Sequence, residues 1–160
     1  MKEAVAQYLE HLDRIFKVEP RYFKHSKEDD FPPFFSFTYK NIPEKGMVTG
    51  FTSGISFVDQ PGGGNVRPEL MVCVDTEDDL WVLALADIGY QHRGEYSFKA
   101  GDTINFNSQI SKESEMTSFV SVHFRTSYSH LRSRDKLCTH HYRRVIWQSE
   151  LTATLHNGSN

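Results

Sequence analysis

Cysteine is scarce in this sequence, and long apolar runs are missing from it. Only Cys73 and Cys138 occur among the 160 residues, whereas small secreted domains that depend on disulfides carry a denser, paired set. We therefore expect both thiols to be reduced. A membrane-spanning helix needs a run of about 18 apolar residues, and the sequence contains none. The N-terminus mixes charged with apolar residues, unlike a signal peptide. These features predict a cytoplasmic protein without a membrane partner.

A surplus of basic residues is missing as well. The chain has 18 Lys and Arg against 21 Asp and Glu, which gives a formal net charge of −3 at pH 7. The charge is distributed unevenly, because residues 125–160 contain six basic and two acidic residues and leave −7 for residues 1–124. Binding to nucleic acid or to anionic membranes normally requires basic residues gathered on one face. Nucleic acid is therefore not the expected partner.

The N-terminal part of the chain predicts a helix followed by a loop. Within residues 3–17 the apolar side chains fall on one face of an amphipathic helix, at Val5, Tyr8, Leu9, Leu12, Ile15 and Phe16. We interpret residues 19–33 as a loop, because Pro20 disfavours continuation of the helix and further prolines and acidic residues follow. The helix is expected to pack its apolar face on the core.

Three strands are predicted in the middle of the chain. Residues 34–39 and 47–57 are rich in aromatic and β-branched side chains, and a turn-forming segment separates them. Residues 69–74 form a short, largely apolar segment that is typical of a buried strand. The first two strands are expected to be neighbours in one sheet.

The clearest helix signal lies at residues 77–92. Thr76 is a plausible N-cap before a run of acidic residues, and Gly94 marks the expected end. The body of this helix is apolar on nearly every side, so it is expected to be buried. Two more strands are predicted at 103–106 and 116–124. The fold class is therefore α+β, with a mixed or antiparallel sheet, a buried central helix and an N-terminal amphipathic helix.

The last 36 residues differ from the rest of the sequence. Their apolar residues are sparse and follow no sustained period. Residues 145–147 are expected to add an edge strand, and residues 157–160 are expected to be disordered. We therefore assign residues 1–124 to the folded domain and residues 125–160 to a divergent, basic and partly disordered C-terminal segment.

Motifs for catalysis are weak. The segment Gly-Phe-Thr-Ser-Gly at 50–54 has Thr52 where a nucleophile elbow requires the serine. General acid/base chemistry requires carboxylates or histidines that converge in a cleft. Asp87, His92 and Glu95 are the only candidates, and for Asp87 a structural role is favoured.

The C-terminal segment leaves two alternatives open. It holds residue types that bind zinc, although their spacing is not that of a closed zinc site: His130, Cys138, His140 and His141. A metal-dependent or acid/base enzyme is therefore one alternative function. The same segment alternates basic and aromatic residues, among them Arg132, Arg134, Tyr128, Tyr142 and Trp147. A nucleic-acid-binding module is the other alternative.

Four segments, in the order in which they occur, resemble the Suppressor-of-fused family. They are Thr-Ser-Gly-Ile-Ser at 52–56, Arg-Pro-Glu-Leu at 67–70, Asp-Leu-Trp-Val-Leu-Ala at 79–84 and Phe-Lys-Ala-Gly-Asp-Thr-Ile at 98–104. In that family a Gly-Leu/Ile-Ser strand precedes a Pro-Glu-Leu strand, a buried helix that begins near a Trp, and a Phe-x-x-Gly-Asp turn. The resemblance covers about residues 34–124 and is lost in the C-terminal segment.

The resemblance implies an α+β domain that binds another protein. The animal members of the family sequester a transcription factor through a peptide taken up as an added strand, and single-domain bacterial members include immunity proteins that neutralise toxins. By position, Tyr90 and Asp102 resemble residues that grip the partner peptide, and we add Arg93 and Glu95 to this predicted partner-binding set. Asp102 has an equally good alternative role, which is to cap its own turn by bonding the backbone.

The sequence thus predicts a non-enzymatic binding domain. We expect a stoichiometric inhibitor, such as an immunity protein, that acts by occlusion without catalytic residues, metal or cofactor. The partner is expected to be a protein, and the charge of −7 on residues 1–124 would suit a basic toxin domain, because opposite charge speeds encounter. The identity of the partner and the oligomeric state are not determined by the sequence.

Overall fold

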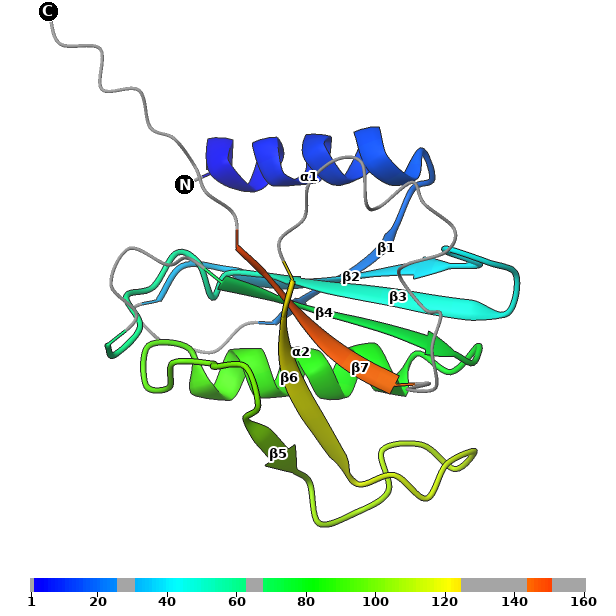
Figure 1. Ribbon diagram of the computed structural model, residues 1–160. Helices are drawn as coiled ribbons and strands as arrows, with labels where there is room; N and C mark the ends of the chain where they lie inside the picture. Colours follow the sequence, from blue (N-terminus) through cyan, green and yellow to red (C-terminus); the bar gives the residue numbers. More distant parts are fainter. Residues whose placement is uncertain (1, 26–30, 63–67, 125–143, 151–160) are drawn as a thin grey trace, which may run out of the picture.

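A mixed sheet with one helix on each face forms the body of the protein (Figure 1). The computed structural model describes residues 2–25, 31–62, 68–124 and 144–150. In chain order these contain α1 (Lys2–Phe16), β1 (Arg21–His25), β2 (Phe34–Lys40), β3 (Met47–Ser53), β4 (Pro68–Asp75), α2 (Leu80–His92), β5 (Thr103–Asn105), β6 (Ser118–Phe124) and β7 (Arg144–Glu150). The strands described lie in the order β1-β2-β3-β4-β7-β6-β5, and only β6 and β7 are parallel. The predicted α+β class is confirmed.

The strand β4 is buried on both of its faces. Seven of its eight residues are buried, which explains why the sequence there is apolar without alternation. Leu70, Val72 and Val74 face α2, whereas Met71 and Cys73 face α1. Because successive side chains of a strand point to opposite faces, this one strand contributes to two separate hydrophobic clusters.

The helix α2 lies close to the sheet because glycine stands at the contact. A Cβ atom at Gly50 would lie 2.5 Å from Val82 Cγ2, which is closer than such atoms approach in proteins. At Gly89 a Cβ atom would lie 2.9 Å from Ile55 Cδ1. The close packing of α2 on the sheet therefore requires glycine, which has no side chain, both in β3 at Gly50 and in α2 at Gly89. The expectation that this helix is buried is confirmed, since its inner face is buried at Trp81, Val82, Leu85, Ala86, Ile88 and Gly89.

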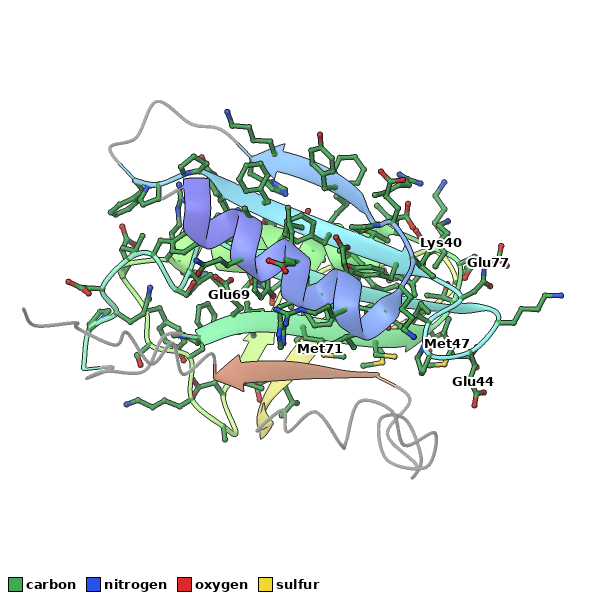
Figure 2. The ribbon with its side chains drawn as sticks, turned by 90° about the horizontal axis from the view of Figure 1, so that it is seen from above. Lys40, Glu44, Met47, Glu69, Met71 and Glu77 are labelled. Carbon is green, nitrogen blue, oxygen red and sulfur yellow. The ribbon has the colours of Figure 1, made fainter. Side chains whose placement is uncertain are left out.

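The helix α1 covers the opposite face of the sheet through aromatic side chains (Figure 2). Tyr8 and Leu12 are buried there, and the ring of Phe16 lies 4.5 Å from that of Tyr39 and 5.4 Å from that of Phe51, measured between centroids. The apolar face predicted for residues 3–17 therefore meets the core, and this expectation is confirmed.

The structure corrects the boundaries of two predicted elements. The segment predicted as a loop contains β1, whose backbone pairs in register with β2 from Arg21 opposite Thr38 to His25 opposite Phe34. Its residues are mostly exposed, so the sequence lacks the apolar signal of a core strand. Strand β3 ends at Ser53 rather than at residue 57, because the chain turns at Gly54, where φ is +138°.

The start of α2 also differs from the prediction. The helix begins at Leu80 with Asp79 at the N-cap, not at residue 77 with Thr76 as the cap. The Thr76 hydroxyl instead accepts a hydrogen bond from the Asp78 N–H at 3.0 Å, which forms a local turn. Glycine at the other end behaves as expected, because Gly94 has φ of +79° just beyond the helix.

The C-terminal segment contributes a strand to the interior of the sheet. We expected residues 145–147 at an edge, but β7 lies between β4 and β6, with Val72 opposite Ile146 and Ser121 beside the same residue. The edge assignment is therefore wrong, and the sheet continues past residue 124, where we placed the end of the domain. The disorder expected for residues 157–160 concerns a part of the chain outside the described residues.

Replacing Gly50 by alanine should destabilise the protein through a clash with α2. Because the added Cβ atom would lie 2.5 Å from Val82 Cγ2, we expect Gly50→Ala to lower the free energy of unfolding by about 1–3 kcal/mol. Chemical denaturation measures this loss. In a Val82→Ala background the same change should cost much less, and an equal cost in both backgrounds would contradict the packing argument.

Candidate protein-binding surface

Tyr90 lies where the last turn of α2 meets the edge of the sheet. Its ring centroid is 5.6 Å from that of Phe34 on β2 and 5.9 Å from that of His25 on β1. The side chain is half-buried rather than fully enclosed. Tyr90 therefore adjoins the edge strand β1, which the sequence did not reveal.

Arg93 is buried beside Tyr90 and holds the segment that precedes β2. Only 3% of the residue is exposed. Its guanidinium carbon lies 4.7 Å from the ring centroid of Tyr90, 5.3 Å from that of Phe31 and 5.5 Å from that of Phe34. Its Nη1 donates a hydrogen bond of 2.7 Å to the carbonyl oxygen of Pro32. In this conformation the Arg93 side chain is engaged within the fold and presents little surface to a partner.

Asp102 and Glu95 lie in the segment that leads from α2 to β5. The Asp102 Oδ2 accepts a hydrogen bond of 2.7 Å from the Lys99 N–H, so this carboxylate caps its own turn. A hydrogen bond from the Tyr96 hydroxyl to Asp102 raises the pKa of Tyr96. Glu95 precedes Tyr96 and is exposed. The structure thus brings Tyr90 and Arg93 into one cluster and places Asp102 in a separate turn.

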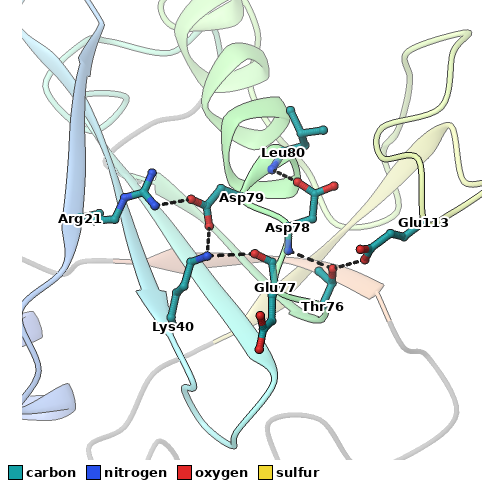
Figure 3. Close-up of polar contacts among 8 residues, drawn as sticks. All are labelled: Arg21, Lys40, Thr76, Glu77, Asp78, Asp79, Leu80 and Glu113. Carbon is teal, nitrogen blue, oxygen red and sulfur yellow. Dashed lines mark hydrogen bonds and ion pairs between the residues drawn. The ribbon is translucent and has the colours of Figure 1, made fainter.

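The edge strand β1 contacts both ends of α2. At the N-terminal end of the helix, Arg21 Nη1 lies 2.8 Å from Asp79 Oδ2 (Figure 3). At the other end, His25 packs on Tyr90. Alternate residues of β1 face the α2 side of the sheet, beginning with Arg21. His25 lies opposite Phe34, which belongs to the cluster under α2, and Phe23 lies on the same side two residues away. The alternating Tyr22 and Lys24 are exposed on the α1 side, Tyr22 to 66%.

The outer edge of β1 is the notable surface feature of this region. Among the described residues β1 pairs only with β2, so its other edge offers backbone groups to solvent. Exposed apolar side chains lie on and beside this strand at Val18, Tyr22 and Phe31. The aromatic and β-forming residues of Arg-Tyr-Phe-Lys-His, directly after Pro20, were a signal that could have identified the strand.

The N-terminal end of α2 carries a polar network (Figure 3). Lys40 Nζ lies 3.3 Å from Asp79 Oδ1 and donates a hydrogen bond of 3.0 Å to the carbonyl oxygen of Glu77. The Thr76 hydroxyl donates a 2.8 Å hydrogen bond to Glu113, and Asp78 Oδ1 accepts one of 3.0 Å from the Leu80 N–H. Asp78 therefore bonds one N–H at the start of the helix, whereas the N-cap residue Asp79 makes no side-chain capping bond and pairs with Arg21 and Lys40.

The structure does not assemble the predicted acid/base candidates around a reactive group. Asp87 is exposed, and its Oδ2 accepts a hydrogen bond of 2.7 Å from the Gln91 side chain. A serine–histidine pair does occur, since His25 Nε2 lies 3.0 Å from Ser36 Oγ. Ser36, however, is fully buried, so a substrate in solution cannot reach its hydroxyl in this conformation. Burial also lowers the pKa of His25, an effect that nearby Asp87 opposes and Arg93 reinforces.

Glu69 is a buried carboxylate that joins two of the segments on which the family resemblance rests. Its Oε1 accepts hydrogen bonds from Gly54 N–H at 2.8 Å, from Ser56 N–H at 3.1 Å and from the Ser56 hydroxyl at 2.6 Å. Its Oε2 accepts a fourth, of 2.7 Å, from the Thr52 hydroxyl. The glutamate of the Pro-Glu-Leu strand therefore holds the turn of the Gly-Ile-Ser segment. Burial raises the pKa of Glu69, although these hydrogen bonds act in the opposite direction.

The candidate metal ligands of the C-terminal segment, His130, Cys138, His140 and His141, lie outside the described residues. In the part of the chain that is described, no group of three or more His, Cys, Asp or Glu side chains is arranged to hold a metal ion. No helix among the described residues is long and apolar enough to cross a membrane.

Comparison with known proteins adds no further assignment. No protein-family model, curated protein or solved structure matches the chain.

The buried position of Glu69 leads to a prediction about pH. A carboxyl group whose pKa is higher in the folded than in the unfolded state contributes most stability below its ordinary value of 4.5. That contribution is lost as the pH rises through the raised pKa, at about 1.4 kcal/mol for each unit by which the pKa is raised. We therefore compare the native protein with Glu69→Gln. As the pH rises from the ordinary value of 4.5 through the raised pKa, the free energy of unfolding of the native protein should fall relative to that of the variant.

Urea denaturation of both proteins between about pH 4 and pH 8 measures this difference, since every other titrating group is common to them. A difference that instead grows in favour of the native protein at higher pH would show that the four hydrogen bonds outweigh burial.

Arg93 should contribute to stability. Replacing it with leucine removes the hydrogen bond to Pro32 and the cation–ring contacts, so we expect a loss of about 2–3 kcal/mol in the free energy of unfolding. Glu95→Ala, at an exposed position two residues along, should change it by less than about 0.5 kcal/mol. Thermal or chemical denaturation compares the two, and a neutral Arg93→Leu would contradict the structural role.

Proposed function

We propose that this protein is a non-enzymatic binding domain that inhibits a protein partner by occluding it. The main support is the outer edge of β1, which is unpaired within the described residues, together with the exposed side chain of Tyr22 on this strand. An unpaired strand edge is a template for an extended segment of another protein, because main-chain hydrogen bonds supply affinity and side chains supply specificity.

Two features of the surroundings suit this role. The edge strand is held in place by the Arg21–Asp79 ion pair at one end and by the contact of His25 with Tyr90 at the other. A preorganised edge loses less conformational entropy when a partner binds. The exposed ring of Tyr22 provides an aromatic anchor on this strand, and tyrosine is enriched among residues that dominate binding energy.

The resemblance to the Suppressor-of-fused family favours a specific form of this function. We propose an immunity-type protein of the cytoplasm that neutralises a toxin, since the bacterial single-domain members of that family include such immunity proteins. The net charge of −7 on residues 1–124 would speed encounter with a basic toxin domain such as a nuclease. No cofactor is required, because occlusion makes and breaks no covalent bond.

The test is direct binding to the product of the neighbouring gene. We expect the two purified proteins to form a complex with one copy of this chain per toxin domain, with loss of the toxin's activity. Tyr22→Ala should weaken the complex at least about tenfold, because a truncated anchor typically costs more than 1 kcal/mol. Val120→Ala, which truncates an exposed apolar side chain on the distant strand β6 without changing the charge, is the control and should leave the affinity unchanged.

Equal affinities for the two variants would show that the Tyr22 side chain is not an anchor of the interface. Absence of any complex, together with turnover of a small molecule that one point change abolishes, would overturn the proposed function itself.

A further inference from the structure

The two faces of the sheet carry separate hydrophobic clusters. The cluster under α2 includes Phe34, Val72, Trp81 and Leu85, and the cluster under α1 includes Tyr8, Leu12, Phe37, Tyr39 and Phe51. No buried residue belongs to both of these clusters. Removing α1 from the sheet would therefore leave the packing between α2 and the sheet intact.

The two helices are attached to the sheet in different ways. The inner face of α2 is buried over most of its length, and the helix approaches the backbone of β3 at Gly50. Within residues 6–16, α1 buries only Tyr8 and Leu12, while Leu9 and Phe16 are partly buried. Its contact with the sheet runs through these side chains, and the ring centroid of Tyr8 lies 6.3 Å from that of Phe37.

The interface under α1 contains two hydroxyl groups that lack hydrogen bonds. Tyr8 is 8% exposed and Tyr39 is fully buried. Within the described part of the chain, neither phenol oxygen has a hydrogen-bond partner. A buried hydroxyl without a partner costs about 1–3 kcal/mol. Both groups would regain hydrogen bonds with water if α1 moved away, so they oppose its docking.

The connection from α1 to β1 allows such movement. The helix ends at Phe16, and Lys17 follows in the left-handed conformation with φ of +54°. Val18 and Glu19 are exposed before β1 begins at Arg21. A short exposed connection of this kind can change its dihedral angles without disturbing the sheet.

From these observations we propose that α1 is a releasable cover, which detaches as a unit while the sheet and α2 stay folded. Release exposes an aromatic face of the sheet that is formed by Phe37, Tyr39 and Phe51. This inference concerns the face opposite α2 and does not depend on the function proposed for the edge of β1.

Amide hydrogen exchange of the full chain tests the proposal in a variant that shortens the side chain of a core leucine. Leu85→Ala weakens the cluster under α2. In the proposal this cluster stays intact whether α1 is docked or released, so the substitution should not change the free energy of release. We therefore expect protection of the α2 and β4 amides to fall at least about tenfold, while protection of amides 6–16 stays the same. An equal fall for both groups would show that α1 opens only with global unfolding and would overturn the proposal.

A second measurement stands if Leu85→Ala does not fold. In low urea, exchange of the native protein's α1 amides should depend on the denaturant less steeply than exchange of the α2 amides, because release exposes the cluster under α1 and leaves the cluster under α2 buried. Exchange of the α2 amides should accelerate steeply. Equal sensitivity of the two groups would overturn the proposal.

The hydroxyl groups provide a third reading. Tyr8→Phe removes one phenol oxygen without a partner, so it should raise the protection of amides 6–16 by about threefold to tenfold. A fall in protection would show that this oxygen stabilises the docked helix, which would contradict the proposed reason for release.

Discussion

The burial of β4 on both faces is the constraint on which the rest of the structure depends. A strand in this position must offer apolar side chains to each side, and Leu70, Val72 and Val74 on one face alternate with Met71 and Cys73 on the other. Each face then requires a cover, and α1 and α2 supply the two layers (Figure 1). The polar residue within this strand, Glu69, is accommodated because four donors surround its carboxylate.

The two covers differ because the side chains beneath them differ. Glycine at position 50 lets α2 approach the backbone of β3, so that side of the protein is closely packed. Under α1 the sheet presents the large rings of Phe37, Tyr39 and Phe51, and the phenol oxygens of Tyr8 and Tyr39 have no hydrogen-bond partner in the described interface. These differences are the basis on which we propose that α1 is released more easily than α2.

The edge strand β1 is supported by residues of α2 and of the segment that precedes β2. Arg93 is enclosed by rings and bonded to the Pro32 carbonyl, which fixes the chain as it enters β2. Tyr90 and His25 continue this support to β1. Among the residues predicted to bind a partner, Arg93 and Asp102 thus have structural roles that the structure explains. Tyr22, which the sequence analysis did not single out, is the residue of this strand whose exposed side chain we propose as an anchor.

The sequence by itself determined the elements whose signal is local. The apolar residues of α1 recur at helical spacing, and the body of α2 is apolar. Strands β2 and β3 are rich in β-branched and aromatic residues, and β4 is largely apolar. Each pattern predicts its element, because side-chain periodicity follows backbone geometry. The capping of its own turn by Asp102 was also a foreseeable local interaction.

Only the tertiary structure decided which residues meet across the sheet. Strand β1 forms because β2 offers it a partner, and β7 lies inside the sheet because β4 and β6 both pair with it. The residue types in β1 and β7 are compatible with strands, but they do not indicate which strands each of them pairs with. Other contacts likewise involve residues that are distant in the chain. They are the burial of Arg93, the hydrogen bonds to the Glu69 carboxylate and the close approach of α2 at Gly50. Such contacts arise from packing between elements, and the order of residues in one element does not encode them.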